Sequence, residues 1–113
     1  MTRRARKYLF DIQDACQQLE LYVRDVPTLA DCREDRKTRD AIARQLGIIG
    51  EAVNQYRREP GIVPLTNMVA IVRFCNLLIH AYDNVDDYEV WRVLHDDLPI
   101  LRQEVAALVA AES

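Results

Sequence analysis

The chain has 113 residues, enough for one small domain, and we predict a single domain over residues 1–113. Half of the residues are hydrophobic and only three are glycine, a composition that favours a helical globular fold. The net charge of −3 argues against a protein that coats nucleic acid through bulk electrostatics, so any such contact has to be local. No apolar run is long enough to span a membrane, and we expect a soluble, cytoplasmic protein that binds no membrane.

The cysteines indicate neither a disulfide framework nor a metal site. Cys16, Cys32 and Cys75 form no CxxC pair and lack the histidine spacing of a zinc site. We expect reduced thiols, no metal and no cofactor.

The first predicted helix covers about Arg3 to Val26. Apolar residues recur there at steps of three and four, which is typical of an amphipathic helix: Leu9, Ile12, Cys16, Leu19 and Val23. The helix begins with a basic cluster: Arg3, Arg4, Arg6 and Lys7. This cluster could touch phosphate, but a solvated helix end is the favoured interpretation. Pro27 interrupts the pattern, and we predict a loop over Leu29 to Lys37.

A second long helix is predicted from about Arg36 to Arg58. It contains Gly47 and Gly50, each of which costs up to about 1 kcal/mol relative to alanine inside a helix. Their presence indicates that another helix packs very close to this one. A break rich in proline and glycine follows at residues 59–64 and allows the next helix to run antiparallel.

The central helix, with Thr66 or Asn67 as its cap, is predicted to run to about Tyr82. It is mostly apolar but carries Arg73, Asn76 and His80, which fall in one polar line because steps of three and seven return to nearly the same side of a helix. Burying such groups without partners costs several kcal/mol, so the line must face water, a partner chain or a substrate.

Two further helices complete the pattern. Asp86 is expected to cap a helix that carries Trp91, and Pro99 to begin a last helix with Leu98 and Leu101 facing inward. The predicted fold is therefore all-α, an antiparallel, up-and-down bundle of about five helices.

The polar line suits one reaction in particular. Histidine moves protons near neutral pH, and arginine grips phosphate and stabilises its developing charge. Metal-independent RNA cleavage needs a base for the 2′-hydroxyl and an acid for the 5′-oxygen, which two copies of His80 from a two-fold dimer could supply. Spacing alone also allows a plain structural role, in which Arg73 pairs with Glu51 or an aspartate and Asn76 bonds across a dimer interface.

The order of the residues adds to this argument. The segments RDAIARQLGIIGEAVN and IVRFCNLLIHAYDNVDDYEVW, followed by DDLPIL, resemble the HEPN-domain toxins of the HepT type. The most specific elements are residues 50–52, the run from Asn76 to Tyr82, Asp86 followed by Trp91, and the pair Leu98-Pro99.

The resemblance implies a HEPN helical bundle that forms a two-fold homodimer and cuts RNA in a composite cleft without metal. Its Arg-x(4–6)-His motif is satisfied by Arg73 and His80, with Asn76 orienting the site. It further implies the toxin of a type VII-like HEPN/MNT toxin–antitoxin system, whose partner is a minimal nucleotidyltransferase. That antitoxin is expected to neutralise the toxin by attaching AMP to Tyr82; without the resemblance, Tyr82 would be read as a packed aromatic. Glu51 and Asp86 also match family positions, without a catalytic role.

The sequence departs from the family at Cys75. The arginine more commonly stands immediately before the asparagine, which is this position. Either Arg73 takes over from two residues earlier, which geometry favours, or the motif has lost its arginine and the chain is an impaired or inactive HEPN dimer that binds the nucleotidyltransferase or a nucleotide. In a third reading the protein is a scaffold dimer, with the polar line in an interface closed to solvent.

Overall fold

A computed structural model describes residues 1–80 and 85–112 of the chain, and most of these residues are helical. In chain order the elements are α1 (Arg3–Arg24), α2 (Leu29–Glu34), α3 (Arg36–Tyr56), α4 (Met68–His80), α5 (Asp87–Arg92), the π-helical turn η2 (Val93–Asp97) and α6 (Leu98–Ala111). No strand occurs within the described ranges. The predicted all-α fold is confirmed.

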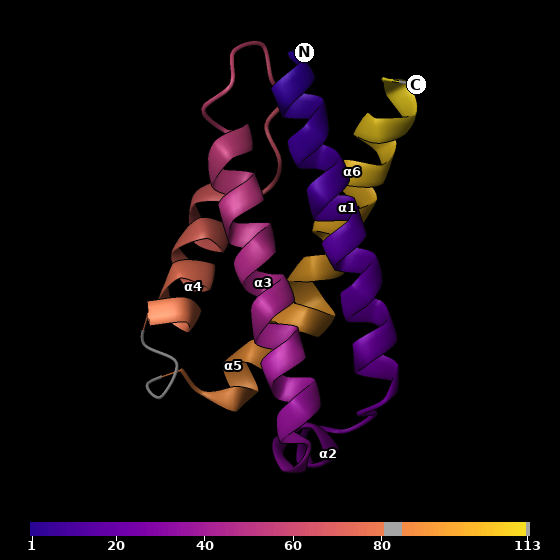
Figure 1. Ribbon diagram of the computed structural model, residues 1–113, viewed down its shortest axis with the longest axis vertical. Coiled ribbons are helices and arrows are strands. Elements are labelled where there is room, and N and C mark those ends of the chain that lie inside the picture. Colours follow the sequence, from indigo (N-terminus) through magenta and orange to yellow (C-terminus); the bar gives the residue numbers. More distant parts are fainter. Residues whose placement is uncertain (81–84, 113) are drawn as a thin grey trace.

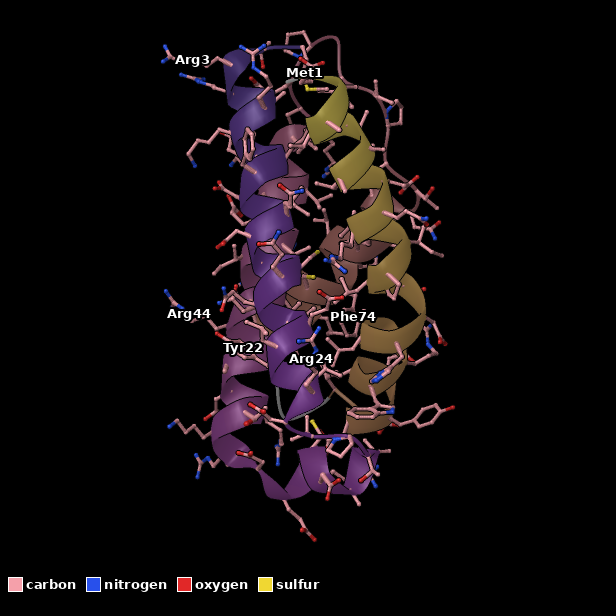
Figure 2. The ribbon with its side chains drawn as sticks, turned by 90° about the vertical axis from the view of Figure 1, so that its right-hand side faces the viewer. Met1, Arg3, Tyr22, Arg24, Arg44 and Phe74 are labelled. Atoms are coloured by element: carbon pink, nitrogen blue, oxygen red, sulfur yellow. The ribbon has the colours of Figure 1, made fainter. Side chains whose placement is uncertain are left out.

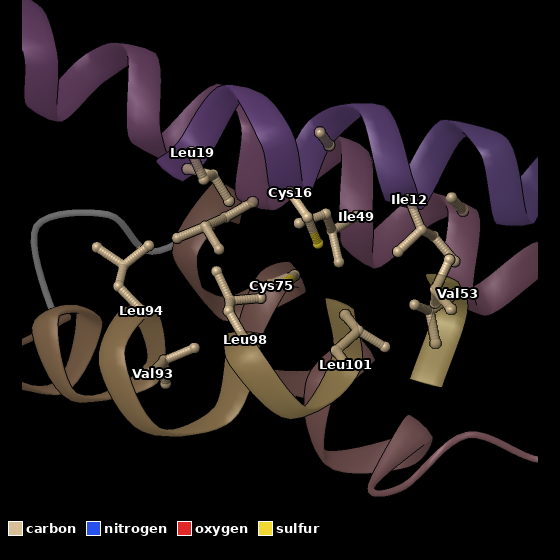
Figure 3. Close-up of a cluster of buried hydrophobic side chains, with 14 of the residues drawn as sticks. Ile12, Cys16, Leu19, Ile49, Val53, Cys75, Val93, Leu94, Leu98 and Leu101 are labelled. Atoms are coloured by element: carbon tan, nitrogen blue, oxygen red, sulfur yellow. The ribbon is translucent and has the colours of Figure 1, made fainter. Parts of the chain in front are cut away.

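The two longest helices, α1 and α3, run antiparallel along the length of the molecule (Figure 1). Helix α6 lies beside α1, and α4 packs on α3 at the edge of the bundle. The core fills the space between these helices with buried aliphatic side chains, several of which are drawn in Figure 3: Ile12, Leu19, Ile49, Val53 and Leu101. Because α4 is covered mainly from the side of α3, its opposite side stays open.

Short polar side chains start several of the helices. The Thr2 hydroxyl accepts a hydrogen bond from the Ala5 N–H at 3.0 Å, and the Asp35 carboxylate accepts one from the Thr38 N–H at 3.0 Å. Asp86 caps α5 as predicted, accepting from the Tyr88 N–H at 2.9 Å. Pro99 lies in the first turn of α6, where proline is well tolerated in a helix.

The predicted loop over Leu29 to Lys37 was wrong. The chain there forms α2 and then enters α3 directly. Thr28 caps α2 by accepting from the Asp31 N–H at 3.1 Å, and Cys32 is buried against the rest of the bundle. A six-residue helix is too short to show a repeating apolar pattern. The one available signal was the spacing of Thr28 and Asp31, which is typical of a helix start.

The chain between α3 and α4 is tied to the bundle by side chains. The Tyr56 hydroxyl donates to the Val63 carbonyl at 2.6 Å. Thr66 donates from its N–H and its hydroxyl to the Glu104 carboxylate of α6, at 3.0 and 2.7 Å. The Thr66 side chain therefore anchors the start of α4 to α6, and the residue that follows, Asn67, adopts a left-handed backbone conformation with a φ of 60°.

The two helical glycines of α3 face α4, as predicted. A Cβ atom added at Gly50 would lie 2.3 Å from the Cβ of Cys75, so the helices approach too closely there for any larger residue. A Cβ at Gly47 would lie 3.0 Å from the Cδ1 atom of Ile79, the flexible end of a long side chain. The contact at Gly50 is the tighter and the less yielding of the two.

We predict that Gly50→Ala lowers the free energy of unfolding by about 1–3 kcal/mol, the usual cost of overpacking a core. Gly47→Ala is the matched control: Ile79 can move aside, and the higher helix propensity of alanine contributes up to about 1 kcal/mol in the opposite direction. Urea unfolding of both variants measures the difference. Equal losses at the two positions would contradict the close contact between α3 and α4.

Candidate active site

The three residues of the polar line, Arg73, Asn76 and His80, are all exposed on α4. The buried residues of the same helix are Val72, Cys75 and Leu78. Successive residues turn by about 100°, which places the polar line on the side of α4 that points away from α3. The requirement that this line avoid the core is met.

The polar line extends over about two helical turns. Arg73 and His80 are seven residues apart, about 10 Å along the axis, and Asn76 lies between them. His80 is the last residue of α4. Glu51, considered as a partner for Arg73, instead accepts a hydrogen bond from Gln55 at 2.9 Å within α3. Among the described residues Arg73 forms no ion pair, so its guanidinium is available to an anion from outside.

Position 75, where the resemblance leads us to expect an arginine, points into the protein. Cys75 is 2% exposed and lies among Ile49, Leu98 and Leu101 (Figure 3). Burial raises the pKa of its thiol to about 12, so the side chain is a neutral and unreactive core residue. An arginine here would project into the contact with Gly50 rather than toward His80.

Apolar side chains flank the polar line on the exposed side of α4. Leu77 is 51% exposed and Val69 is 56% exposed, and each is one helical turn from Arg73. The sequence predicted a mostly apolar helix here but did not indicate which of its apolar residues are exposed. Both residues lie four positions from Arg73 in the sequence. Residues four apart share one side of a helix, so this spacing predicts that they lie on the side of Arg73. The open side of α4 is therefore a mixed apolar and polar surface.

A cavity of about 210 Å³ lies between α4 and the α5–α6 segment, lined by Phe74 and Ile71 on one side and Arg92 on the other. Two carboxylates hold Arg92, Glu89 at 2.7 Å and Asp97 at 3.3 Å, and the hydrogen bond that Arg92 donates to Glu89 raises the pKa of the guanidinium further. This cation is already neutralised, which makes the cavity a poor site for phosphate.

One of the predicted site residues lies outside the residues that the structure describes. Tyr82, the predicted modification site, falls within residues 81–84, which the structure does not describe. Within residues 1–80 and 85–112, no three His, Cys, Asp or Glu side chains gather as metal ligands. No helix within these ranges is both long and apolar enough to cross a bilayer.

Known proteins resemble this chain over most of its length. The family model described as "Ribonuclease HepT-like" matches residues 12–108. A protein of Thermococcus cleftensis named "Probable ribonuclease HepT" is 35% identical over 106 residues, which cover 90% of this chain and 93% of that protein. A protein of Methanocaldococcus jannaschii named a putative RNase is 29% identical over 107 residues, covering 91% and 94% of the two chains. No solved structure gives a significant match.

The burial of the Cys75 thiol predicts that the folded protein loses stability at alkaline pH. Burial raises the pKa of Cys75 from 9.0 to about 12, so between these values the folded thiol keeps its proton while the unfolded thiol loses it. The unfolded state then binds fewer protons, and the free energy of unfolding falls as pH rises, by at most about 1.4 kcal/mol per pH unit for one thiol. Below pH 9 this thiol contributes no pH dependence.

Urea unfolding from pH 8 to pH 11 tests this expectation. Cys75→Ala should lose stability less steeply above pH 9 than the unmodified protein, because one titrating thiol is gone. Leu21→Ala, at an exposed position of α1, should show the unmodified slope. Identical slopes for all three proteins would show that Cys75 ionises normally in the fold.

Proposed function

Because the chain belongs to the family of HepT-like ribonucleases, we propose that it is a metal-independent RNA endonuclease with its catalytic groups on the open side of α4. The observation that carries the proposal is the exposed line of Arg73, Asn76 and His80, in which Arg73 has no carboxylate partner among the described residues. An unpaired guanidinium about 10 Å from an exposed imidazole suits a phosphodiester substrate.

The proposed reaction is an internal transfer within the RNA. A base removes the proton of the 2′-hydroxyl, the 2′-oxygen attacks the adjacent phosphorus, and an acid gives a proton to the leaving 5′-oxygen as its bond to phosphorus breaks. One imidazole cannot readily perform both proton transfers at once. We assign the base and the acid to two copies of His80, and the stabilisation of the extra phosphate charge to Arg73, with Asn76 orienting the site.

The second His80 would come from a homodimer. The open side of α4 combines the polar line with Leu77 and Val69, and a two-fold axis beside this helix would bring both copies of the line into one cleft. Burial of the apolar pair would supply contact energy at the dimer interface, while the polar groups would remain accessible to RNA.

Arg73 is the better candidate for the phosphate-gripping group. Cys75 faces Gly50 inside the bundle, whereas Arg73 is exposed on the same side of α4 as His80. Arginine is long enough to cover much of the distance between them. The same departure at Cys75 motivates a second candidate function, an inactive HEPN dimer that binds a nucleotidyltransferase or a nucleotide.

We further propose that the protein is the toxin of a type VII-like HEPN/MNT toxin–antitoxin system. Its partner would be a minimal nucleotidyltransferase that attaches AMP to Tyr82. Tyr82 follows His80 by two residues in the sequence, so an adenylate there would add negative charge and bulk where the RNA phosphate must bind.

The catalytic proposal is tested by exchanging the two histidines separately. His80→Ala should slow RNA cleavage by about 10²–10⁴-fold, the usual contribution of a general acid or base. His95→Ala is the matched control, because His95 is also exposed but lies in η2, where its ring stacks on Trp91. Gel assays of a labelled RNA give the rates. Equal cutting by the unmodified protein and His80→Ala would exclude His80 from the mechanism, and no cutting by the unmodified protein would favour the inactive dimer.

The dimer proposal is tested at Leu77. Leu77→Glu places a charge on the open side of α4 and should convert dimers to monomers, because a buried unpaired carboxylate is costly at an interface. Leu21→Glu is the control, since Leu21 is 50% exposed on α1, away from α4. Light scattering gives the mass of each variant. A Leu77→Glu protein that stays dimeric would show that the two copies meet elsewhere.

A further inference from the structure

Exposed cations from two distant parts of the chain gather at one end of the bundle. Because α1 and α3 are antiparallel, the amino end of α1 lies beside the carboxyl end of α3 (Figure 1). Thr2 joins them directly by donating its hydroxyl hydrogen to Glu59 at 2.8 Å. We call this end the basic pole and define it by its exposed cations: Arg3, Arg4, Arg6, Lys7, Arg57 and Arg58.

The carboxylates at the basic pole are too few to neutralise it. Asp11 pairs with Lys7 at 2.8 Å, and Glu112 pairs with Arg6 at 3.7 Å. Glu59 is engaged with the Thr2 hydroxyl. Within the described part of the chain, four of the six arginine and lysine side chains therefore form no ion pair: Arg3, Arg4, Arg57 and Arg58.

The opposite end of the bundle shows a different balance. Between residues 24 and 40 the cations and carboxylates are equal in number and interspersed along the chain: Arg24, Arg33, Arg36, Lys37 and Arg39 against Asp25, Asp31, Glu34, Asp35 and Asp40. The helix ends of this protein can therefore be solvated without an excess of positively or negatively charged side chains. The basic pole is a local exception in a chain whose net charge is −3.

The position of the cations on α1 also argues for a ligand. The amino end of a helix carries partial positive charge, so cations in the first turn are unfavourable and carboxylates are preferred. The first turn of α1 has no acidic residue and begins with Arg3 and Arg4, and its cap, Thr2, is neutral. The first turn of α3 also carries cations, Arg36 and Lys37, but its cap is the Asp35 carboxylate. Figure 2 shows the Arg3 side chain extending from the bundle at this end. A local arrangement that opposes helix stability is expected where a residue serves binding instead.

We infer that the basic pole is a second RNA-binding surface, which holds the sugar-phosphate backbone away from the cleavage site. This inference rests on the proposed function. Arginine is well suited to phosphate because its planar fork of donors matches phosphate oxygens. A membrane surface is a weaker occupant, since the apolar face of α1 is buried in the core and is not available for insertion.

The distance between the basic pole and the polar line sets the minimum length of an RNA that binds both. Gly47 of α3 contacts Ile79, the neighbour of His80, and Arg57 follows ten residues later along the same helix. Ten helical residues extend about 15 Å. At about 3.4 Å per stacked nucleotide, RNA held at both places must continue for roughly five nucleotides or more beyond the cleavage site. The inferred substrate class is an extended or folded RNA rather than a short oligonucleotide.

Binding of uncleavable RNA tests the inference without requiring activity. A fluorescein-labelled 2′-O-methyl RNA of about 20 nucleotides cannot be cut by the proposed route, because its 2′-oxygen is blocked. Arg3→Gln/Arg4→Gln should weaken its binding about tenfold at 0.1 M salt. The slope of log K against log salt should fall by about 1.4, or 0.7 for each lost phosphate contact. Fluorescence anisotropy over a salt series gives both values.

The matched control is Arg36→Gln/Lys37→Gln. It makes the same change of charge in the first turn of α3, at the opposite end of the bundle. It should leave the salt slope unchanged. Thermal unfolding should show that Arg3→Gln/Arg4→Gln is at least as stable as the unmodified protein, since cations leave the amino end of a helix.

Two results with RNA would overturn the inference: an equal loss of RNA binding in both double variants, or no loss in either. Binding to phosphatidylglycerol vesicles is measured alongside, and a loss of vesicle binding in Arg3→Gln/Arg4→Gln without a loss of RNA binding would also overturn it. The cleavage assay with His80→Ala judges the nuclease proposal separately, so the two can fail independently.

Discussion

The close approach of α3 and α4 at Gly50 and Cys75 decides what α4 can present to the outside. A Cβ atom at Gly50 would lie only 2.3 Å from the Cβ of Cys75, so the two helices meet there backbone to side chain. This contact fixes the rotation of α4 about its own axis. Once Cys75 points inward, Arg73 and His80 must point outward, because they lie more than a third of a turn away from it. The candidate active site thus follows from a packing constraint in which none of its own residues takes part.

The edge position of α4 turns that constraint into a functional surface. The core lies mainly between α1, α3 and α6, which bury their apolar faces against one another. Helix α4 can therefore leave Leu77 and Val69 half exposed without weakening that core. A monomer gains nothing from such exposure, whereas a two-fold partner would cover the apolar pair and bring a second imidazole to the same cleft. The proposed dimer and the proposed chemistry thus depend on the same side of the same helix.

The sequence predicted the long elements well, and its failures have physical reasons. Local patterns that need no knowledge of the fold predict the helices α1 and α3, the cap at Asp86, the start of α6 near Pro99 and the close contact at the glycines. Helix α2 was not predicted because six residues are too few to show a repeating apolar pattern. The exposure of Leu77 was not predicted either, because apolar periodicity does not reveal which neighbour covers a residue. The polar line was found because a core would not accept it. The gathering of cations at one end depended on the antiparallel arrangement and could be seen only in three dimensions.

The departure at Cys75 is consistent with the packing around it. The residues that surround this position from α3 and α6 are apolar, including Ile49, Leu98 and Leu101. An arginine there would need a carboxylate partner that these neighbours do not supply, and a buried unpaired charge costs several kcal/mol. A small thiol fits beside Gly50 with no such cost. In this chain, then, position 75 serves the contact between α3 and α4, and a cation able to reach phosphate has to come from another position on the helix. Arg73 meets that requirement. It lies about 3 Å farther from His80 along the helix axis than position 75 does, and the length of its side chain can offset this difference.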